Sequence, residues 1–255
     1  MPISLVCCGL IGTMVNDDGT LERAFAEACA TQGVVPGTAA YAHSMVGVHQ
    51  SRGQPPVEVF RSLFPGGEGR AEAATLSFER SFRAGVDRSG LSPMPGAEDA
   101  LAELRHSGIR LCLVTSLSRR LLGTLLDMLG WWRLADLALC PEDVPRGCPW
   151  PDLMLAAMLR LGVEDVREAA FADSDASGVM CGRRSGAGIV AGVLSGGHTR
   201  DRLRAAGATH LIGEIAELPP LLAGIGVDGS APSPAGPAGP TPAPRVPLER
   251  RSAGL

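Results

Sequence analysis

The chain of 255 residues contains no lysine, so all 23 of its cationic side chains are arginines. A mechanism that forms a Schiff base through a side-chain amine is therefore excluded, because that amine belongs to lysine. Aromatic residues are also scarce, at 4% of the sequence. The net charge of −4 gives no reason to expect nucleic acid or an anionic membrane as a partner.

Long hydrophobic runs and leader-like features are absent as well. No apolar run reaches the length of a membrane span, and no basic segment followed by a long apolar one opens the chain. The seven cysteines are scattered without the spacing of a metal site, and they lie in apolar runs that favour reduced, buried thiols. These features predict a soluble, cytoplasmic protein.

Most of the chain alternates between short apolar runs and helical patterns. The runs that we expect as strands are residues 3–8, 109–114, 137–140, 169–172, 189–194 and 210–212. Helices are expected at 97–105 before Gly108, from Ser118 to Gly130, and at 151–161. This alternation predicts an α/β fold with a mostly parallel sheet, helices on both faces, and ligands at the carboxyl ends of the strands.

Two segments depart from the alternation. Residues 17–92 show helical patterns at 21–30, 57–63 and 71–82, with Thr20 as the expected N-cap of the first, which predicts an all-helical cap inserted after the first strand. Residues 226–255 are rich in proline, alanine and glycine, which predicts a disordered tail. Residues 1–16 and 93–225 then form the α/β core.

Four segments of this core resemble, in order, the sequence blocks of one family. They are LVCCGLIGTMVNDDGTLERAF, LCLVTSLSRR, VPRGCPWPDLMLAAM and FADSDASGVMCGRRSGAG, and a closing segment of some thirty residues begins GVLSGGHTRDRL. The chain resembles the haloacid dehalogenase (HAD) superfamily, specifically its phosphonatase-like branch. The resemblance implies a HAD-like Rossmannoid core with a helical cap, and Mg²⁺-dependent hydrolysis through an aspartyl-phosphate.

The residues that the family's chemistry requires are missing from their positions. The position of the nucleophilic aspartate is Gly9, and that of the acid/base residue two places on is Ile11. Cys148 stands at the position of the third block's cation. Arg146 lies two residues upstream and is an alternative source of that positive charge. The cap lysine with which phosphonatases form an imine aligns with Pro56. No catalytic residue of the family is therefore intact.

The metal site that the resemblance implies is also incomplete. Asp173 stands at the first carboxylate position of the fourth block, but Ser177 stands at the second, and Asp175 is out of register with both. Mg²⁺ is normally held by one or two protein carboxylates with phosphate oxygens and waters. We expect Asp173 to bind it only weakly, and no cofactor is expected.

The residues that shape an anion site are retained. Turns, hydroxyl groups and helix N-termini could still bind a phosphate, and the predicted ligand-binding residues are Gly12, Thr13, Thr115, Ser116, Asp173 and Ser174. The five histidines are scattered and are expected at structural or surface positions.

Three functions remain open. The first choice is a pseudoenzyme that binds a small molecule, phosphorylated or not, or has a regulatory role. The first alternative is a repurposed enzyme that performs an isomerisation, cyclisation or elimination in an enlarged apolar pocket, with Asp173 as general base. The second alternative is a hydrolase of a phosphorylated or phosphonate metabolite that uses substitute residues.

Overall fold

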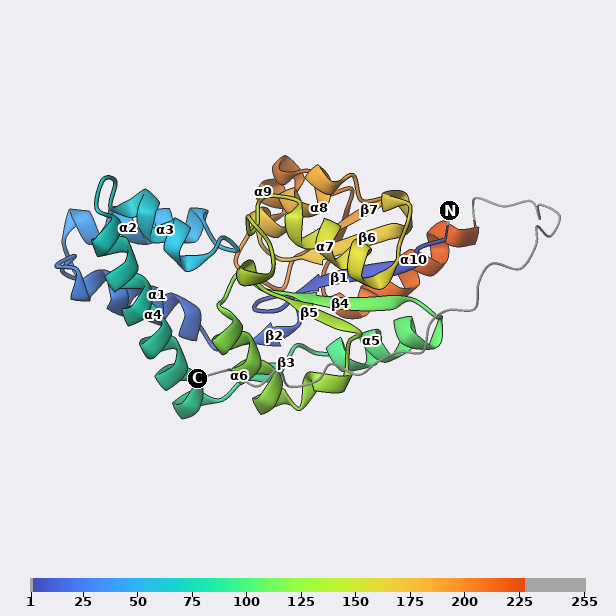
Figure 1. Ribbon diagram of the computed structural model, residues 1–255, viewed down its shortest axis with the longest axis horizontal. Helices are drawn as coiled ribbons and strands as arrows, with labels where there is room; N and C mark the ends of the chain where they lie inside the picture. Colours follow the sequence, from blue (N-terminus) through green and yellow to red (C-terminus); the bar gives the residue numbers. More distant parts are fainter. Residues whose placement is uncertain (1, 228–255) are drawn as a thin grey trace.

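Six strands that run in one direction form the central sheet (Figure 1). The computed structural model describes residues 2–227. The strand order is β5-β4-β1-β6-β7-β8, and every neighbouring pair is parallel. The strands are β1 (Leu5–Gly9), β4 (Arg110–Val114), β5 (Leu137–Leu139), β6 (Ala169–Asp173), β7 (Ile189–Val193) and β8 (His210–Ile212). The predicted α/β fold with a mostly parallel sheet is confirmed.

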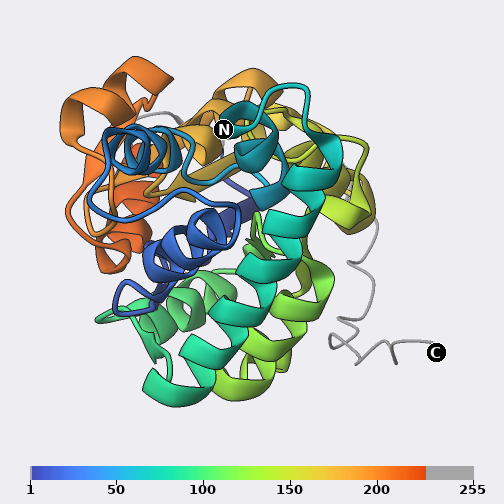
Figure 2. The same cartoon turned by 90° about the vertical axis from the view of Figure 1, so that its left-hand side faces the viewer.

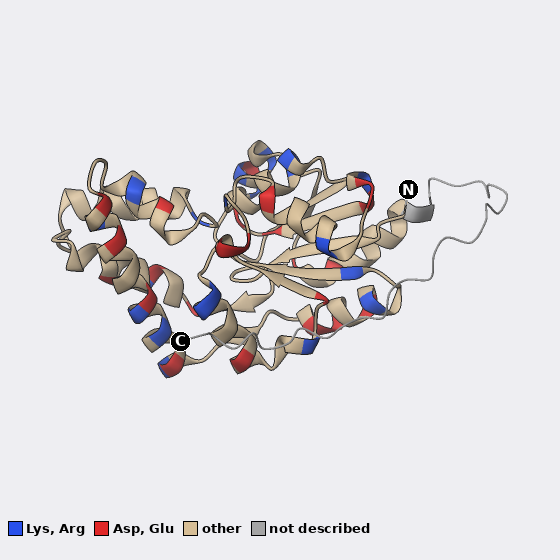
Figure 3. Ribbon diagram, viewed as in Figure 1, with Lys and Arg blue, Asp and Glu red and all other residues tan. Residues whose placement is uncertain are grey.

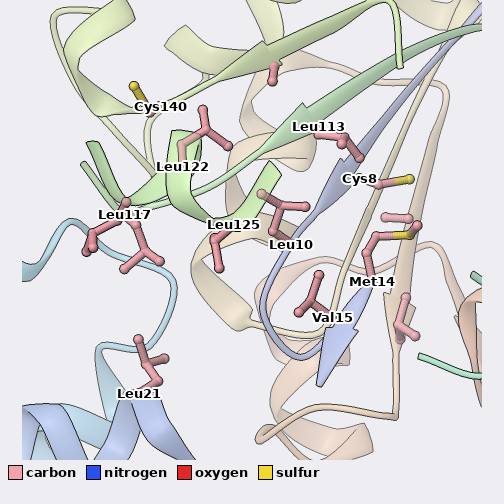
Figure 4. Packing of buried hydrophobic residues seen from close by; sticks show 14 of the residues in the cluster. Cys8, Leu10, Met14, Val15, Leu21, Leu113, Leu117, Leu122, Leu125 and Cys140 are labelled. Atoms are coloured by element: carbon pink, nitrogen blue, oxygen red, sulfur yellow. The ribbon is translucent and has the colours of Figure 1, made fainter. Parts of the chain in front are cut away.

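Helices cover both faces of this sheet (Figure 1). On one face lie α7 (Asp152–Leu161), α8 (Ala176–Ser185) and α9 (Arg200–Ala206), and on the other lie α5 (Ala97–His106), α6 (Arg119–Leu129) and α10 (Leu218–Val227). Strand β1 is buried on both faces, because Cys7 packs in the cluster that contains Met154 of α7 while Cys8 packs in the cluster that contains Leu125 of α6 (Figure 4). A continuous apolar run is what such a strand requires.

Four helices lie together beyond one end of the sheet (Figures 1 and 2). They are α1 (Thr20–Thr31), α2 (Ala39–Gln50), α3 (Pro56–Leu63) and α4 (Glu68–Ser89). The connections into and out of this helical insert are joined by two short antiparallel strands, β2 (Val15–Asn16) and β3 (Ser92–Pro93). The helical character predicted for residues 17–92 is found, while the division into two domains at these boundaries stays a prediction.

Phenylalanine is concentrated in the helical insert. Five of the six phenylalanines of the chain lie there: Phe25, Phe60, Phe64, Phe78 and Phe82. The ring centroids of Phe25 and Phe78 are 4.4 Å apart, and those of Phe25 and Phe60 are 5.4 Å apart. Aromatic pairs at such distances add to the stabilisation that comes from burying their area. These phenylalanines therefore form an aromatic cluster within the insert, which is continuous with the apolar core between the sheet and helices α5 and α6.

Several local predictions need correction. Thr20 does not cap α1, because it is the helix's first residue, and the carboxylate of Asp17 instead accepts a hydrogen bond of 2.6 Å from the N–H of Leu21. Ser118 stands at the N-cap position of α6, but its hydroxyl makes no capping hydrogen bond. Helix α2 was missed because its apolar residues are spread around the helix, and only Ser44 and Val48 are buried.

The ends of other elements agree closely with expectation. The helices α5 and α6 end at the predicted glycines, where Gly108 has a φ of 81° and Gly130 a φ of 69°, a conformation that favours glycine. The predicted tail from residue 226 lies outside the described residues except for its first two, which belong to α10.

Charged residues of both signs are distributed over the helices and loops (Figure 3). The six strands carry few of them, and the sheet interior is apolar. Among residues 2–227, no helix combines the length and the apolar character that crossing a membrane would require.

Replacement of Phe78 by alanine tests the aromatic cluster of the insert. Phe78 is fully buried, so the Phe78→Ala variant is expected to lose about 3–5 kcal/mol of unfolding free energy. Urea denaturation followed by circular dichroism measures the loss. The matched control is Leu76→Ala on the same helix, whose side chain is 62% exposed and whose loss should stay within about 0.5 kcal/mol. Equal effects of the two substitutions would contradict the packing described above.

Candidate functional site

A small cavity lies at the carboxyl end of the sheet, where β1, β4 and β6 end side by side. Its volume is about 30 Å³. The cavity is lined by the strand tips, by the loops that follow them, by Leu153 of α7, and by Leu21 and Gly53 of the helical insert. The lining residues are Gly9, Leu10, Ile11, Leu21, Gly53, Val114, Thr115, Ser116, Leu117, Cys148, Leu153, Asp173 and Asp175. Leu21 of the insert and Leu117 of the core approach each other from facing elements (Figure 4).

The side chain of Asp173 occupies the space beside Gly9. A Cβ atom at Gly9 would lie 2.5 Å from Oδ2 of Asp173, closer than real Cβ contacts come. A Cβ atom at Gly178 would overlap the same carboxyl group from the other side. The carboxyl group thus sits between two glycines, and the enlarged pocket expected from the loss of a side chain at residue 9 is not found.

Hydrogen bonds hold Asp173 in this position. Its Oδ1 accepts a bond of 2.9 Å from the N–H of Asp175 and lies 3.5 Å from the hydroxyl of Thr13. That hydroxyl also accepts the N–H of Ser174 at 2.9 Å and lies 3.0 Å from the Ser174 hydroxyl. Because these groups come from the loop after β1 and the tip of β6, they tie the two strand ends together.

Burial makes Asp173 an unusual carboxyl group. Burial, and after it the negative charge of Asp175, raises the pKa of Asp173 to about 8, although hydrogen bonds from Asp175, Ser174 and Thr13 act in the opposite direction. The carboxyl group is therefore largely protonated at neutral pH. In that state the group can donate a proton but cannot act as a nucleophile.

The third block supplies no cation to the cavity. Cys148 lines it and is buried, and its hydrogen bond with Cys181, followed by burial, raises the pKa of its thiol well above the ordinary value. Arg146 does not reach in, because its guanidinium binds both carboxylate oxygens of Asp152 and stacks over Trp150. Arg146 therefore does not take the place of the missing cation of the third block.

The start of α8 is occupied by a histidine that the sequence analysis did not single out. Nδ1 of His198 accepts the N–H of Ala176 at 2.9 Å, so Nε2 carries the proton and donates to the carbonyl oxygen of His49 at 3.0 Å. Burial, as the main cause, lowers the pKa of His198, which agrees with a neutral ring. This N–H of the helix N-terminus is therefore not free for a phosphate.

The helical insert contributes the cation nearest to these carboxylates. Arg52 donates from Nε to Oδ1 of Asp175 at 3.1 Å, and its Nη1 lies 3.6 Å from the carboxylate of Glu22. The side chains of Arg52 and Asp175 are only 10% and 8% exposed. Arg52 could not be identified from the sequence, because its partner Asp175 lies 123 residues away and no local pattern connects the two. Pro56 begins α3.

The six predicted ligand-binding residues divide into two groups. Thr115, Ser116 and Asp173 line the cavity. Gly12, Thr13 and Ser174 do not; they form a support behind it, in which the Ser195 hydroxyl donates to the carbonyl oxygen of Gly12 at 2.9 Å. Ligand binding by any of the six stays a prediction.

Comparison with known proteins agrees with this architecture. The model of the haloacid dehalogenase-like hydrolase family matches residues 4–186. That match covers well over half of the chain, so the protein belongs to the haloacid dehalogenase-like hydrolase family.

Within the family, the chain is similar to phosphonoacetaldehyde hydrolases. It is 35% identical over 156 residues to the phosphonoacetaldehyde hydrolase of Bordetella pertussis. The match covers 52% of this chain and 56% of that protein. The chain is 32% identical over 125 residues to the one of Pseudomonas fluorescens, covering 48% of this chain and 46% of that protein. The chain thus spans about half the length of these curated relatives.

Solved structures show the same fold. A hydrolase from Pseudomonas syringae superimposes with a TM-score of 0.76 at 22% identity, covering 87% of this chain and 99% of the other. A phosphonoacetaldehyde hydrolase-like protein from Oleispira antarctica gives a TM-score of 0.68 at 20% identity, covering 91% and 96%. At such identities the likeness concerns the fold alone.

The residues present do not fit the Mg²⁺ ion that the family resemblance implies. Gly9 has no carboxylate, Ser177 is a buried hydroxyl residue, and the carboxyl group of Asp173 is turned into the space beside Gly9. Across residues 2–227 there is no group of three or more histidine, cysteine or acidic side chains placed to hold a metal ion.

The raised pKa of Asp173 predicts a characteristic pH dependence of stability. The folded protein binds this proton more tightly than the unfolded chain, whose aspartates have a pKa near 4, so the contribution of Asp173 is full below about pH 4 and is lost as the pH rises through about 8. The Asp173→Asn variant cannot ionise, so its unfolding free energy relative to the wild type should increase between pH 5 and pH 9, by about 1 kcal/mol or more.

Chemical denaturation across that pH range measures the difference. The control is Asp165→Asn, because the hydrogen bonds from Arg167 lower the pKa of the exposed Asp165 to about 2, and its effect should be constant from pH 5 upward. Parallel pH profiles for the wild type and Asp173→Asn would show that Asp173 is already ionised.

A methyl group at residue 9 tests the packing of Asp173. The Gly9→Ala variant is expected to lose about 1–3 kcal/mol, because the added carbon meets the Asp173 carboxyl group. In an Asp173→Ala background the same substitution should cost little. Gly69→Ala serves as the control, because nothing lies within 4 Å of its Cβ position and alanine favours the helix. An equal cost of Gly9→Ala in both backgrounds would refute the contact.

Proposed function

We propose that this protein is a pseudoenzyme of its family, which has lost the hydrolysis of phosphate and phosphonate groups and binds a small molecule. The observation that supports this most directly is the tip of β1. Gly9 offers no nucleophile there, and the nearby Asp173 is a buried acid that remains largely protonated at neutral pH. An aspartyl-phosphate intermediate requires an ionised carboxylate at the reacting atom.

Other positions support the same proposal. Cys148 offers a protonated thiol in place of a cation, and Arg146 is engaged by Asp152 at the surface. Without lysine, no imine can form with an aldehyde substrate. Loss of a nucleophile alone typically removes a factor on the order of 10⁶ in rate, and this chain lacks the cation and the metal site as well.

The proposed ligand enters only when the helical insert moves. A cavity of about 30 Å³ is far below the several hundred Å³ of sites that bind metabolites. The insert closes this cavity through Leu21 and Gly53, so we propose that residues 17–92 act as a cap. Apolar side chains line the cavity together with the hydroxyls of Thr115 and Ser116 and the carboxyl groups of Asp173 and Asp175. This mixture favours a small organic ligand, with or without a phosphate group, and no cofactor.

The setting of Asp173 favours a second candidate, an enzyme with non-phosphoryl chemistry. A carboxyl group with a pKa of about 8 that lines a closed cavity has the property of a general acid or base near neutral pH. Isomerisation, cyclisation or elimination requires such proton transfer and neither a phosphoryl nucleophile nor a metal.

Family membership favours the third candidate, a hydrolase like the phosphonoacetaldehyde hydrolases that this chain resembles. It requires an ionised carboxylate at the tip of β1, where this chain has Gly9. For location and partners, all seven cysteines are free and buried, which supports a reducing, cytoplasmic setting. We propose neither nucleic acid nor membrane as a partner, and the oligomeric state is left open.

A turnover assay separates the proposal from the hydrolase. The purified chain with Mg²⁺ is expected to release no phosphate from an aryl phosphate or from phosphonoacetaldehyde above the rate in buffer. An Asp173→Ala variant purified in parallel identifies contaminating phosphatases, which act equally in both samples. Mg²⁺-dependent turnover that Asp173→Ala abolishes would overturn the proposed loss of hydrolysis.

Ligand screening separates the binder from the repurposed enzyme. Thermal-shift measurements against pairs of phosphorylated and unphosphorylated metabolites are expected to find a ligand that raises Tm and is recovered unchanged by mass spectrometry. A ligand recovered as an isomer or an elimination product, in a reaction that Asp173→Asn stops, would establish the second candidate instead.

A further inference from the structure

We infer that Arg52 of the helical insert replaces the metal ion as the cation that balances the buried charge of this site, and that it thereby holds the insert closed. The inference deepens the proposed function, on which it rests, by making the site independent of divalent metals. It assigns a positioning role to one arginine and to the short segment that carries it, residues 49–53, named the clasp below.

The first support is the buried ion pair. Arg52 and Asp175 lie on elements separated by 123 residues in sequence, and their side chains are 10% and 8% exposed. A charge buried to this degree is strongly unfavourable unless an opposite charge compensates it. Two basic side chains among residues 2–227 lie beside the Asp175 carboxylate, those of Arg52 and His198. His198 is neutral, so Arg52 supplies the positive charge.

The second support is the set of contacts that surrounds this pair. The carbonyl oxygen of His49 accepts a hydrogen bond from Nε2 of His198 at 3.0 Å, and that of Gln50 accepts one from Nη2 of Arg202 at 2.9 Å. Both carbonyls belong to the last turn of α2, where the unsatisfied oxygens of a helix attract donors. Four of the five clasp residues thus contact the start of α8, α9 or the loop between β7 and α9.

The third support is the place of Gly53. A Cβ atom at this residue would lie 2.9 Å from Cβ of Asp175 and 3.2 Å from Cβ of Ser177. Ser177 stands where metal-binding relatives are expected to carry the second carboxylate. A side chain at residue 53 would therefore meet both residues, so the close approach of the clasp to the start of α8 requires this glycine.

Closure and charge compensation are therefore one event. Because the cation is part of the insert, opening the insert removes it from Asp175 and leaves a carboxylate unpaired. A freely diffusing metal ion would not couple the two in this way. The core alone then lacks the positive charge that the closed protein has at this place.

Thermal unfolding of the full chain with and without millimolar Mg²⁺, at matched ionic strength, tests the inference. The wild type should show no Mg²⁺-dependent change in Tm. Arg52→Gln should lower Tm by roughly 10 °C, because it leaves a buried charge unpaired. In this variant Mg²⁺ should raise Tm, and hydrogen exchange of the clasp should become faster.

The double variant Arg52→Gln/Asp175→Asn isolates the charge. It buries no unpaired carboxylate, so it should recover most of the lost Tm and no longer respond to Mg²⁺. Arg202→Gln is the matched control, because it removes a clasp contact to a carbonyl without exposing a carboxylate, and it should not respond to Mg²⁺. If Arg52→Gln does not fold, folding of the double variant supports the inference and its failure to fold overturns it.

Two results would overturn the role of Arg52. One is saturable Mg²⁺ binding by the wild type, and the other is an Arg52→Gln variant with unchanged Tm and unchanged exchange of the clasp. No substrate enters these measurements, so their outcome is separate from the turnover assay. If the wild type binds Mg²⁺ but shows no turnover, only the inference about Arg52 is wrong. If it shows turnover but binds no Mg²⁺, only the proposed function is wrong.

Discussion

The structure of the site depends on where one buried carboxyl group is placed. Asp173 ends β6 beside the tip of β1, and its side chain fills the space between Gly9 and Gly178. A side chain at either glycine would collide with it. The absence of a nucleophile, the raised pKa and the small cavity are thus three consequences of one packing arrangement. An aspartate at residue 9 would require the Asp173 carboxyl group to shift, because that group lies in the space beside Gly9.

Charge balance links this arrangement to the helical insert. A protonated Asp173 contributes no charge, so the carboxylate that needs compensation is that of Asp175, and Arg52 provides it. The low dielectric of a closed site makes such a pair effective only when both partners are well placed and hydrogen-bonded. Residues from the insert therefore determine the electrostatics of a site whose walls come mainly from the sheet. The fold of the family permits this because the insert enters and leaves beside the tip of β1, through β2 and β3.

The sequence predicted the sheet and its strand tips well, and for a clear reason. Strand tips follow directly from apolar runs, so Gly9, Thr115 and Asp173 could be placed on one edge from local pattern and family resemblance alone. Contacts between distant segments could not be read in this way. His198 reaches Ala176 from 22 residues away, and Arg52 reaches Asp175 across the gap between insert and core. The filling of the space at Gly9 was also missed, because an absent side chain says nothing about which neighbour moves in.

The fold survives these changes because its stability comes from elsewhere. The buried strands, the helices on both faces and the phenylalanine cluster of the insert hold the protein together without any residue of the family's catalytic set. In such a site, the position of the helical insert over the cavity matters more than the requirements of a catalysed reaction. In the proposed function a ligand binds only to the open form, so its apparent affinity is its intrinsic affinity reduced in proportion to the fraction of molecules that are open. Weakening the clasp should therefore strengthen binding, and in such a protein the contacts that hide the cavity determine the affinity as much as the contacts that line it.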